Sequence, residues 1–320
     1  MTPDVLLILN RASGIGQASG FASQIAKALR EGHGTRLAIK TKLVDDHPHV
    51  RSAAAEFVSV EKGPVLIVSA GGGGTLRAAV EGIMDAYPKA PPKASRVQLA
   101  GLRMGSGNLV ARALGMPLDP LEAAREVGES LAAGKTKPVG VLRCTHGTPG
   151  GSMTRHAVTM CGLGGFGRVP GDMASHRSKW AGARKNVASV IGLERVTLLE
   201  YLVFGGRRML GGALDASQSE LVEIDRTHRM RLLAAVALNL PFPPLPDPGV
   251  SLGDAAAGLI VVPRFGRPFR RRLEPGKSFE MRLLDRDSVE FFLDEDPEQM
   301  TGWLKLEVAG TLAFVPGGAF

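Results

Sequence analysis

Three short apolar segments near the N-terminus each end in a glycine-rich turn, and this repeated pattern limits the possible folds more than any other feature. The segments 5–9, 65–70 and 97–102 are each followed by such a turn and then by a helix-like stretch. Strand, turn and helix in succession are typical of βαβ units, whose strands lie parallel in one sheet. Because ligands of such sheets bind beyond the carboxyl ends of the strands, the three turns predict one composite site.

The residues of the turns suit a phosphate group. In chain order they are Asn10, Ser13, Gly14, Gly71, Gly72, Gly74, Thr75, Gly105, Ser106, Gly107 and Asn108. Glycine lets backbone N–H groups approach an anion closely, and the helix that follows directs the positive end of its dipole toward it. A single glycine run also serves ordinary tight turns, so the combination of three turns is what favours a nucleotide.

The three turns resemble the signatures of the diacylglycerol kinase catalytic domain, which is shared with sphingosine kinases and, more remotely, with NAD kinases. Those signatures read N-P-x-S-G, G-G-D-G-T and G-T-G-N-x-x-A-R, and this chain fits their order and spacing, with Ala111 and Arg112 ending the third. The resemblance implies that the first turn flanks ATP, that the second contacts its phosphates and that the third closes the pocket. It also implies transfer of a phosphoryl group to a lipid hydroxyl of the diacylglycerol or sphingoid type, with ATP and Mg²⁺ as cofactors.

The chain departs from the family pattern at its acidic positions. Gly73 stands where the family carries aspartate, and Ala78 stands where a glutamate is common. Residues 257–259 read Ala-Gly-Leu where an aspartate–glycine pair often helps to hold magnesium. Residues 293–296 read Leu-Asp-Glu-Asp where the family reads Leu-Asp-Gly-Glu, so the resemblance gives Asp296 the role of the general base, with a shorter side chain.

The missing carboxylates leave three interpretations open. Mg²⁺ is held mostly by oxygen ligands such as carboxylates, and phosphoryl transfer depends on neutralising charge on the transferred group. The metal is then carried mainly by ATP, or Asp294 and Asp296 supply the acid, or catalysis is lost and the protein is a pseudokinase that binds nucleotide or lipid without turnover. The metal ligands themselves are not identified by the sequence.

Length and composition fit a two-domain protein of the cytoplasm. The chain has 320 residues, of which 44% are hydrophobic, enough for two packed cores. Cys144 and Cys161 are its two cysteines, so no disulfide framework is expected, and Cys161, inside an apolar run, is expected to be buried and unreactive. The start of the chain shows neither a basic leader nor a membrane-spanning apolar stretch, and we expect a cytoplasmic location.

A net charge of +8 points to an anionic partner. Residues 176–185 and 264–272 interleave cations with aromatic side chains, a composition that suits the inner face of an anionic membrane. The same composition also suits binding to nucleic acid, a less favoured function. Alternatively, the two segments form a basic surface exposed to solvent. We expect ATP and a lipid as partners and no specific nucleic acid, and we leave open a peripheral contact with an anionic membrane and a homodimer.

The pattern along the chain predicts an α/β fold with an N-terminal, mainly parallel-sheet nucleotide-binding domain and a C-terminal β-rich, β-sandwich-like domain that binds the lipid. We place the domains at residues 1–137 and 138–320, with the last strand, 305–315, free to join either. Predicted helices span 18–30, 51–60, 76–84, 120–133 and 179–191, with Asp119 as an N-cap. Predicted strands of the second domain span 156–160, 195–203, 230–239, 258–262 and 278–284.

Other catalytic and metal sites are disfavoured. His47 and His49 lack a third ligand at a diagnostic spacing for zinc. The serines of the turns lack the Gly-x-Ser-x-Gly elbow of serine hydrolases. We expect Arg112 either to bind a phosphate group or to form an ion pair with an acidic residue on the surface of the protein.

Overall fold

The computed structural model describes residues 2–12, 20–34, 37–105, 109–179, 193–240, 247–294 and 296–318. The chain forms two compact units. Unit 1 consists of Met1–Gly140 and Gly310–Phe320, and unit 2 consists of Val141–Ala309. The sequence predicts a domain boundary after residue 137, whereas unit 1 also includes residues 138–140 and 310–320.

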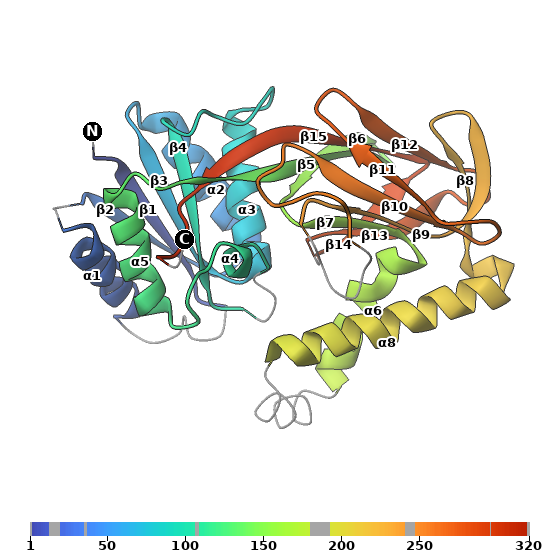
Figure 1. Cartoon of the computed structure of the whole chain (residues 1–320), viewed down its shortest axis with the longest axis horizontal. Helices are drawn as coiled ribbons and strands as arrows, with labels where there is room; N and C mark the ends of the chain where they lie inside the picture. Colours follow the sequence, from blue (N-terminus) through green and yellow to red (C-terminus); the bar gives the residue numbers. More distant parts are fainter. Residues whose placement is uncertain are drawn as a thin grey trace. The chain divides into compact units, whose positions relative to one another are not determined.

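Unit 1 is built on the predicted parallel sheet (Figure 1). Its strands are β1 (Asp4–Asn10), β2 (Ile39–Val44), β3 (Val65–Gly71) and β4 (Val97–Arg103), in the spatial order β2-β1-β3-β4. The end of β15 (Trp303–Phe314) extends the sheet beside β4, where Ala313 pairs with Gln98 in parallel. The sequence left open which unit the last strand joins, and β15 is shared: its first part belongs to unit 2 and its end, from Gly310, to unit 1.

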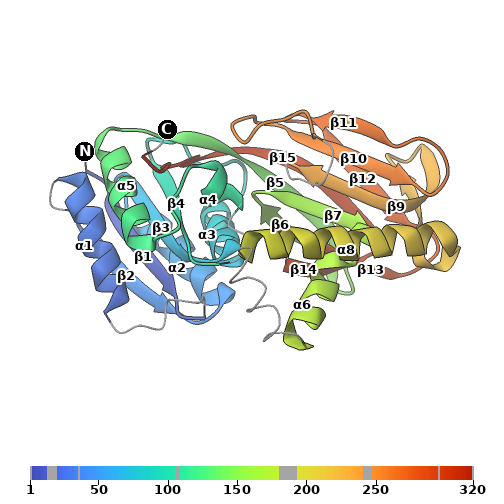
Figure 2. The ribbon, with the colours of Figure 1, turned by 60° about the horizontal axis from the view of Figure 1, so that its bottom comes forward.

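Helices cover both faces of this sheet (Figures 1 and 2). The helices are α1 (Phe21–His33), α2 (His47–Val60), α3 (Gly73–Ala86), α4 (Leu109–Ala113) and α5 (Pro120–Ala132). Helix α1 packs against α5, and α2 packs against α3. Alternate residues of β1 point to opposite faces, so Val5, Leu7 and Leu9 join the core under α1 and α5.

The helix predictions for unit 1 are largely confirmed. The predicted segments 51–60 and 76–84 lie inside α2 and α3, and 120–133 coincides with α5 to within one residue. Asp119 is the N-cap, since its Oδ1 accepts hydrogen bonds from the N–H groups of Leu121 and Glu122, both at 2.8 Å. Helix α1 begins at Phe21 rather than at residue 18; residues 18 and 19 lie outside the described residues.

Glycines allow the paired helices of unit 1 to approach closely. A Cβ added at Gly128 of α5 would lie 2.3 Å from the carbonyl oxygen of Leu29 in α1. A Cβ at Gly82 of α3 would lie 2.2 Å from the carbonyl oxygen of Arg51 in α2. Both neighbours are backbone atoms, which yield only if a whole helix moves.

We therefore predict that Gly128→Ala lowers the free energy of unfolding by about 1–3 kcal/mol, because the added methyl group overpacks the α1–α5 contact. Gly63→Ala is the matched control, since a Cβ there meets nothing within 4 Å. Urea unfolding followed by circular dichroism measures both variants. Equal stability of the two variants would contradict the packing described here.

Unit 2 is rich in antiparallel strands, as predicted for the C-terminal domain. Its strands are β5 (Lys137–Thr148), β6 (Gly151–Ala157), β7 (Met160–Gly164), β8 (Glu220–Ile224), β9 (His228–Leu238), β10 (Ala257–Pro263), β11 (Phe269–Leu273), β12 (Ser278–Leu283), β13 (Ser288–Leu293), β14 (Asp296–Thr301) and most of β15. They follow the order β14-β13-β7-β9-β8-β12-β15, with β10 joining β9 to β11, and β5 pairing with β6 and β15. One core of buried side chains, including Cys144 and Cys161 at 0% exposure, fills this unit, which confirms that Cys161 is buried.

Two local predictions for unit 2 fail. Residues 156–160 are not one strand, because β6 ends at Ala157, a turn follows, and β7 begins at Met160. Residues 195–203 are not a strand either; they lie within the 22-residue helix α8 (Leu193–Leu214). The predicted helix 179–191 falls almost wholly on residues 180–192, which lie outside the described residues.

The described residues of unit 2 also form the helical elements η2 (Gly165–Arg168), α6 (Val169–Lys179) and η3 (Ala216–Gln218). Among the helices described, none combines the length and the apolar composition needed to cross a membrane.

Candidate functional site

The carboxyl ends of three neighbouring strands of unit 1 lie at the same level of the sheet. The register pairs Leu9 of β1 with Ala70 of β3, and Gly71 of β3 with Arg103 of β4. The chain therefore leaves the sheet at three adjacent points, as expected from the three glycine turns.

A buried hydrogen bond joins the first turn to the second. The side-chain amide of Asn10, at the end of β1, donates from Nδ2 to Oγ1 of Thr75 at 3.0 Å. Both side chains are buried, Asn10 being 4% and Thr75 1% exposed. The Asn10 Oδ1 also accepts the N–H of Ala12 at 3.0 Å, which fixes the start of the first turn.

The second and third turns are also in contact. The N–H of Met104, which follows β4, donates to the carbonyl oxygen of Gly71 at 3.1 Å. A Cβ added at Gly72 would lie 3.6 Å from the Cα of Gly105. The backbone of the two glycine turns is thus packed together without side chains between them.

Each glycine of the second turn meets a different constraint. A Cβ at Gly71 would lie 2.4 Å from Oγ1 of Thr75, and a Cβ at Gly74 would lie 2.4 Å from Cε1 of His47. By contrast, a Cβ at Gly73 would meet nothing within 4 Å. Gly71 is therefore required by packing against the buried Thr75, the exposed His47 ring would have to move for a side chain at position 74, and a side chain fits at position 73.

The second turn ends at the N-terminus of α3, which offers donors to an anion. Gly72 is the N-cap in an extended conformation, with no side-chain hydrogen bond to the cap, and the first helical bond runs from Leu76 N to Gly72 O at 3.1 Å. By helix geometry the N–H groups of Gly73, Gly74 and Thr75 have no acceptor in a preceding turn. Because the Thr75 side chain is buried, a phosphate would meet this residue through its backbone N–H.

Two arginines flank the third turn. Arg103 ends β4, and its Nη1 donates to the carbonyl oxygen of Met116 at 3.3 Å. Burial, and then repulsion from the nearby Arg112 guanidinium, lower the pKa of Arg103, yet a guanidinium stays charged at neutral pH. Two positive charges therefore stand close together beside the turn. Arg112 was predicted from the sequence and Arg103 was not. The position of Arg103, last in a strand that leads into a glycine turn, would have indicated a residue of the site.

The structure thus brings six of the predicted residues together in unit 1: Asn10, Gly71, Gly72, Gly74, Thr75 and Gly105. The other five predicted residues of the turns, Ser13, Gly14, Ser106, Gly107 and Asn108, lie outside the described residues. The remaining predicted residue, Asp296, belongs to unit 2.

Asp294, next to Asp296 in sequence, has a structural role. Its side chain is 5% exposed and receives four hydrogen bonds from the turn between β6 and β7. Oδ2 accepts the N–H of Val158 at 2.6 Å, and Oδ1 accepts the N–H and the hydroxyl of Thr159 and the N–H of Met160 at 2.5–3.0 Å. Both carboxylate oxygens are therefore occupied, which argues against the interpretation that Asp294 supplies a metal ligand.

Asp296 differs from Asp294 in its surroundings. It begins β14 and is partly exposed, and it pairs in register with Leu293 across a tight turn in which Asp294 has a φ of 50°. The anchoring of Asp294 thereby holds the position of the Asp296 backbone.

The described residues place few carboxylates near the glycine turns of unit 1 for a magnesium ion. Across the described residues, no group of three or more histidine, cysteine, aspartate or glutamate side chains is placed to hold a metal. Gly73 offers no side chain, and Ala257, where the family often has aspartate, is buried at 0% exposure in β10.

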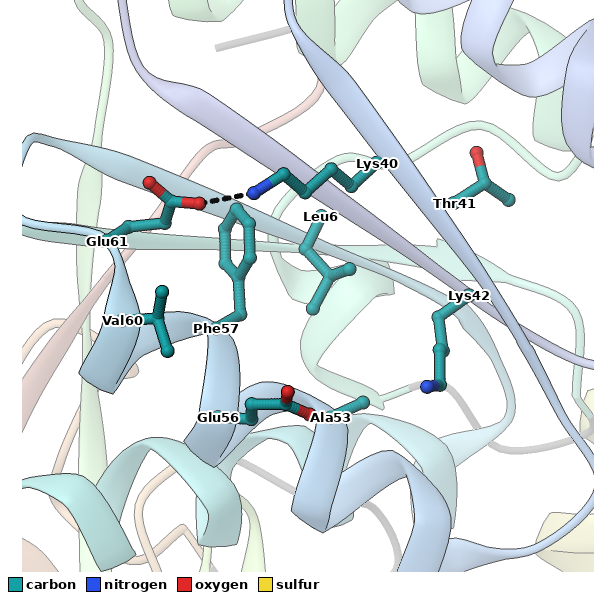
Figure 3. A pocket seen from close by; sticks show the side chains of 9 residues that line it. All are labelled: Leu6, Lys40, Thr41, Lys42, Ala53, Glu56, Phe57, Val60 and Glu61. Atoms are coloured by element: carbon teal, nitrogen blue, oxygen red, sulfur yellow. Dashed lines mark hydrogen bonds and ion pairs between the residues drawn. The ribbon is translucent and has the colours of Figure 1, made fainter.

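A separate hollow of about 210 Å³ in unit 1 lies away from the glycine turns (Figure 3). It is lined by Leu6, Lys40, Thr41, Lys42, Ala53, Glu56, Phe57, Val60 and Glu61. Leu6 and Lys40 pair four residues before Asn10 at the end of β1, a distance of about 13 Å along a strand. Lys40 forms an ion pair with Glu61 and lies 5.5 Å from the Phe57 ring centre, so its charge is already satisfied (Figure 3).

We predict that Asp294→Ala lowers the free energy of unfolding by at least about 2 kcal/mol, because three buried N–H groups and a hydroxyl lose their acceptor. Asp296→Ala, two residues away and partly exposed, is the control and should cost less than about 1 kcal/mol. Denaturant titration monitored by tryptophan fluorescence compares the two variants. A loss of stability that is the same for both would remove the structural role of Asp294.

The chain is similar to known proteins in the sequence of its first part and in its fold. Residues 4–144 match the model of the diacylglycerol kinase catalytic domain. Two solved structures from Bacillus anthracis str. Sterne, both assigned as diacylglycerol kinases, are similar to the whole chain. One has 18% identity, a TM-score of 0.64 and coverage of 99% of this chain and 98% of the other. The second has 16% identity, a TM-score of 0.59 and coverage of 99% and 97%. At these identities the likeness shows the fold, and no curated protein matches the chain.

Proposed function

We propose that this protein transfers the γ-phosphoryl group of ATP to a lipid hydroxyl, because residues 4–144 match the model of the diacylglycerol kinase catalytic domain, a domain of lipid kinases and so of phosphotransferases. The acceptor is proposed to be of the diacylglycerol or sphingoid type. Unit 1 is proposed to bind ATP, and unit 2 is proposed to serve the lipid.

The observation that carries the proposal is the meeting of three turns at one edge of the unit 1 sheet. Asn10 bonds to Thr75, and Gly72 contacts Gly105, so segments 95 residues apart in the chain lie together. The free N–H groups at the start of α3 and the charges of Arg103 and Arg112 favour a polyphosphate there. Ser13, Gly14, Ser106, Gly107 and Asn108 are proposed to complete this site.

The proposed reaction needs positioning and proton removal. The acceptor oxygen forms a bond to the γ-phosphorus while the bond from that phosphorus to the β,γ-bridging oxygen breaks, and ADP leaves. The hydroxyl proton passes to a base, and Asp296 is proposed for this role because its carboxylate is partly exposed and its neighbour Asp294 anchors the turn. The donors at the start of α3 would bind the phosphates during this step and hold them in place.

One alternative, a pseudokinase that binds nucleotide or lipid without turnover, is favoured by the lack of a cluster of metal-holding carboxylates among the described residues. Gly73 has no carboxylate and Asp294 is fully engaged by backbone donors. A transfer assay with radiolabelled ATP and detergent-dispersed diacylglycerol or sphingosine separates the two functions. Label in the lipid eliminates the pseudokinase, whereas saturable ATP binding without label in any lipid eliminates the kinase.

We predict that Gly71→Ala weakens ATP binding by at least about tenfold, because the new methyl group displaces the buried Thr75 side chain and with it the start of α3. Gly73→Ala, in the same turn but in open space, is the matched control and should bind ATP within about threefold of the native chain. Isothermal titration calorimetry measures both affinities, and thermal unfolding checks that each variant is folded. Equal affinities for ATP would contradict the assignment of this turn.

We further predict that Gly73→Asp increases transfer in the presence of Mg²⁺ by about tenfold or more, because the position has room for a side chain and lies at the first turn of α3. Gly73→Asn, which has nearly the same shape without the charge, should not show the increase. If transfer occurs in Gly73→Asp and in no other form, the native chain is the pseudokinase. If transfer in Gly73→Asp does not exceed that in Gly73→Asn, position 73 is not a metal position.

A further inference from the structure

Helix α8 of unit 2 exposes several large apolar side chains. Its inner face includes the buried Val196, Glu200 and Tyr201, and small residues let it pack closely: Gly205 packs against Phe166 and Gly212 against Leu233, and the Tyr201 ring centre lies 6.2 Å from that of Phe166. Arg208 binds both carboxylate oxygens of Asp172 in α6 at 2.7 Å, which ties α8 to its neighbour. The helix is therefore an integral part of unit 2, and its orientation is fixed by these contacts.

The outer side of α8 exposes five large apolar side chains, which we call the α8 face. They are Leu199 at 50%, Leu202 at 45%, Val203 at 64%, Leu210 at 61% and Leu214 at 76% exposure. At 3.6 residues per turn these positions fall within an arc of about 120°. An apolar stripe of this kind, running the length of a helix, is unfavourable in water and marks a contact surface.

Cationic and aromatic side chains of the β10–β11 connection lie at the C-terminal end of this stripe. The Arg264 guanidinium donates to the carbonyl oxygens of Ala213 and Leu214, at 3.3–3.5 Å. The same guanidinium lies 5.0 Å from the ring centre of Phe265, whose side chain is 78% exposed. The connection, residues 264–268, is thus bound to the end of α8, and it carries the exposed Arg267, whereas the exposed Arg270 follows in β11.

We propose that the α8 face, together with Phe265, Arg267 and Arg270, docks this protein on the surface of an anionic phospholipid bilayer. The leucines and Phe265 enter the headgroup and acyl boundary, and the arginines bind the phosphates of anionic lipids. This inference rests on the proposed function, since a lipid kinase must reach an acceptor that resides in a bilayer. It places on unit 2 the membrane contact that the sequence composition left open.

The charges near the α8 face indicate whether an anionic bilayer or a second copy of the chain would bind there. In a twofold dimer through the α8 face, each copy would bring its own arginines toward the same region of the other. The exposed residues 265–270 include Arg267 and Arg270 and no acidic residue, and Asp215, the exposed acid that follows Leu214, interacts with Arg264, so cations outnumber acids at this end of the face. An anionic surface therefore complements this face, whereas an identical face repels it.

Sedimentation of the full chain with vesicles tests the proposal. Vesicles of phosphatidylcholine, with and without about 30 mol% phosphatidylglycerol, provide anionic and neutral surfaces, and no ATP is added. We expect binding to the anionic vesicles that weakens in about 0.5 M NaCl. Val203→Glu combined with Leu210→Glu should lower the partition coefficient at least about tenfold, and Leu118→Glu, at a residue 71% exposed in unit 1, should leave it unchanged.

A second variant tests the charges separately from the apolar stripe. Arg267→Glu combined with Arg270→Glu should weaken binding to anionic vesicles by about thirtyfold and leave binding to neutral vesicles unchanged. Both double variants change exposed side chains only, and circular dichroism checks that they keep the native fold.

Three results would overturn the proposal. The first is a native chain that does not bind anionic vesicles. The second is that both double variants bind anionic vesicles as tightly as the native chain does. The third is a dimer, seen by analytical ultracentrifugation, that the glutamates at 203 and 210 dissociate while vesicle binding is absent. Because the vesicle assay contains no ATP, loss of phosphoryl transfer with vesicle binding intact would overturn the proposed function alone.

Discussion

The buried hydrogen bond between Asn10 and Thr75 is the contact on which the arrangement of unit 1 depends. It joins the end of β1 to the first turn of α3 across 65 residues, and neither side chain is more than 4% exposed. A polar pair removed from water in this way is strongly held, because breaking it leaves two groups without solvent or partner. The bond keeps the helix start beside the end of the first strand, and the contact between Gly72 and Gly105 adds the third turn.

In unit 2, Asp294 stabilises a turn by accepting hydrogen bonds from backbone N–H groups. The acidic residue that sequence comparison would place near a metal instead stabilises the connection between β6 and β7. The chain thus keeps the features that hold a phosphate, namely glycine turns, a helix start and arginines, and has few of the carboxylates that hold a cation. This imbalance is the physical reason for weighing a pseudokinase beside the proposed lipid kinase.

Much of the fold could be predicted from the sequence, because local signals and the buried environment agree. Residues 65–70 are mostly apolar and are followed by glycines, so both the strand and the turn could be assigned, and Asp119 followed by proline marked the start of α5. The family resemblance and the α/β class are confirmed, with a parallel sheet in unit 1 and antiparallel strands in unit 2.

The failures have identifiable physical causes. Residues 195–203 were assigned to a strand because they contain valine, threonine and tyrosine, which favour strands, and because α8 exposes Leu199 and Leu202, so the segment lacks the usual pattern of a packed helix. The role of Asp294 was missed because its donors, Val158 to Met160, are more than 130 residues away in sequence. The burial of the Thr75 side chain likewise depends on Asn10, a partner that no local pattern reveals.

Hydrogen–deuterium exchange with and without ATP tests most directly whether the three turns form one anion site. The account predicts that ATP slows exchange together at the amides that follow Asn10, at Gly72 to Thr75, and at Gly105 and the residues after it, with little change around the hollow lined by Lys40 and Phe57. Protection confined to one of the three turns, or centred on that hollow, would contradict it.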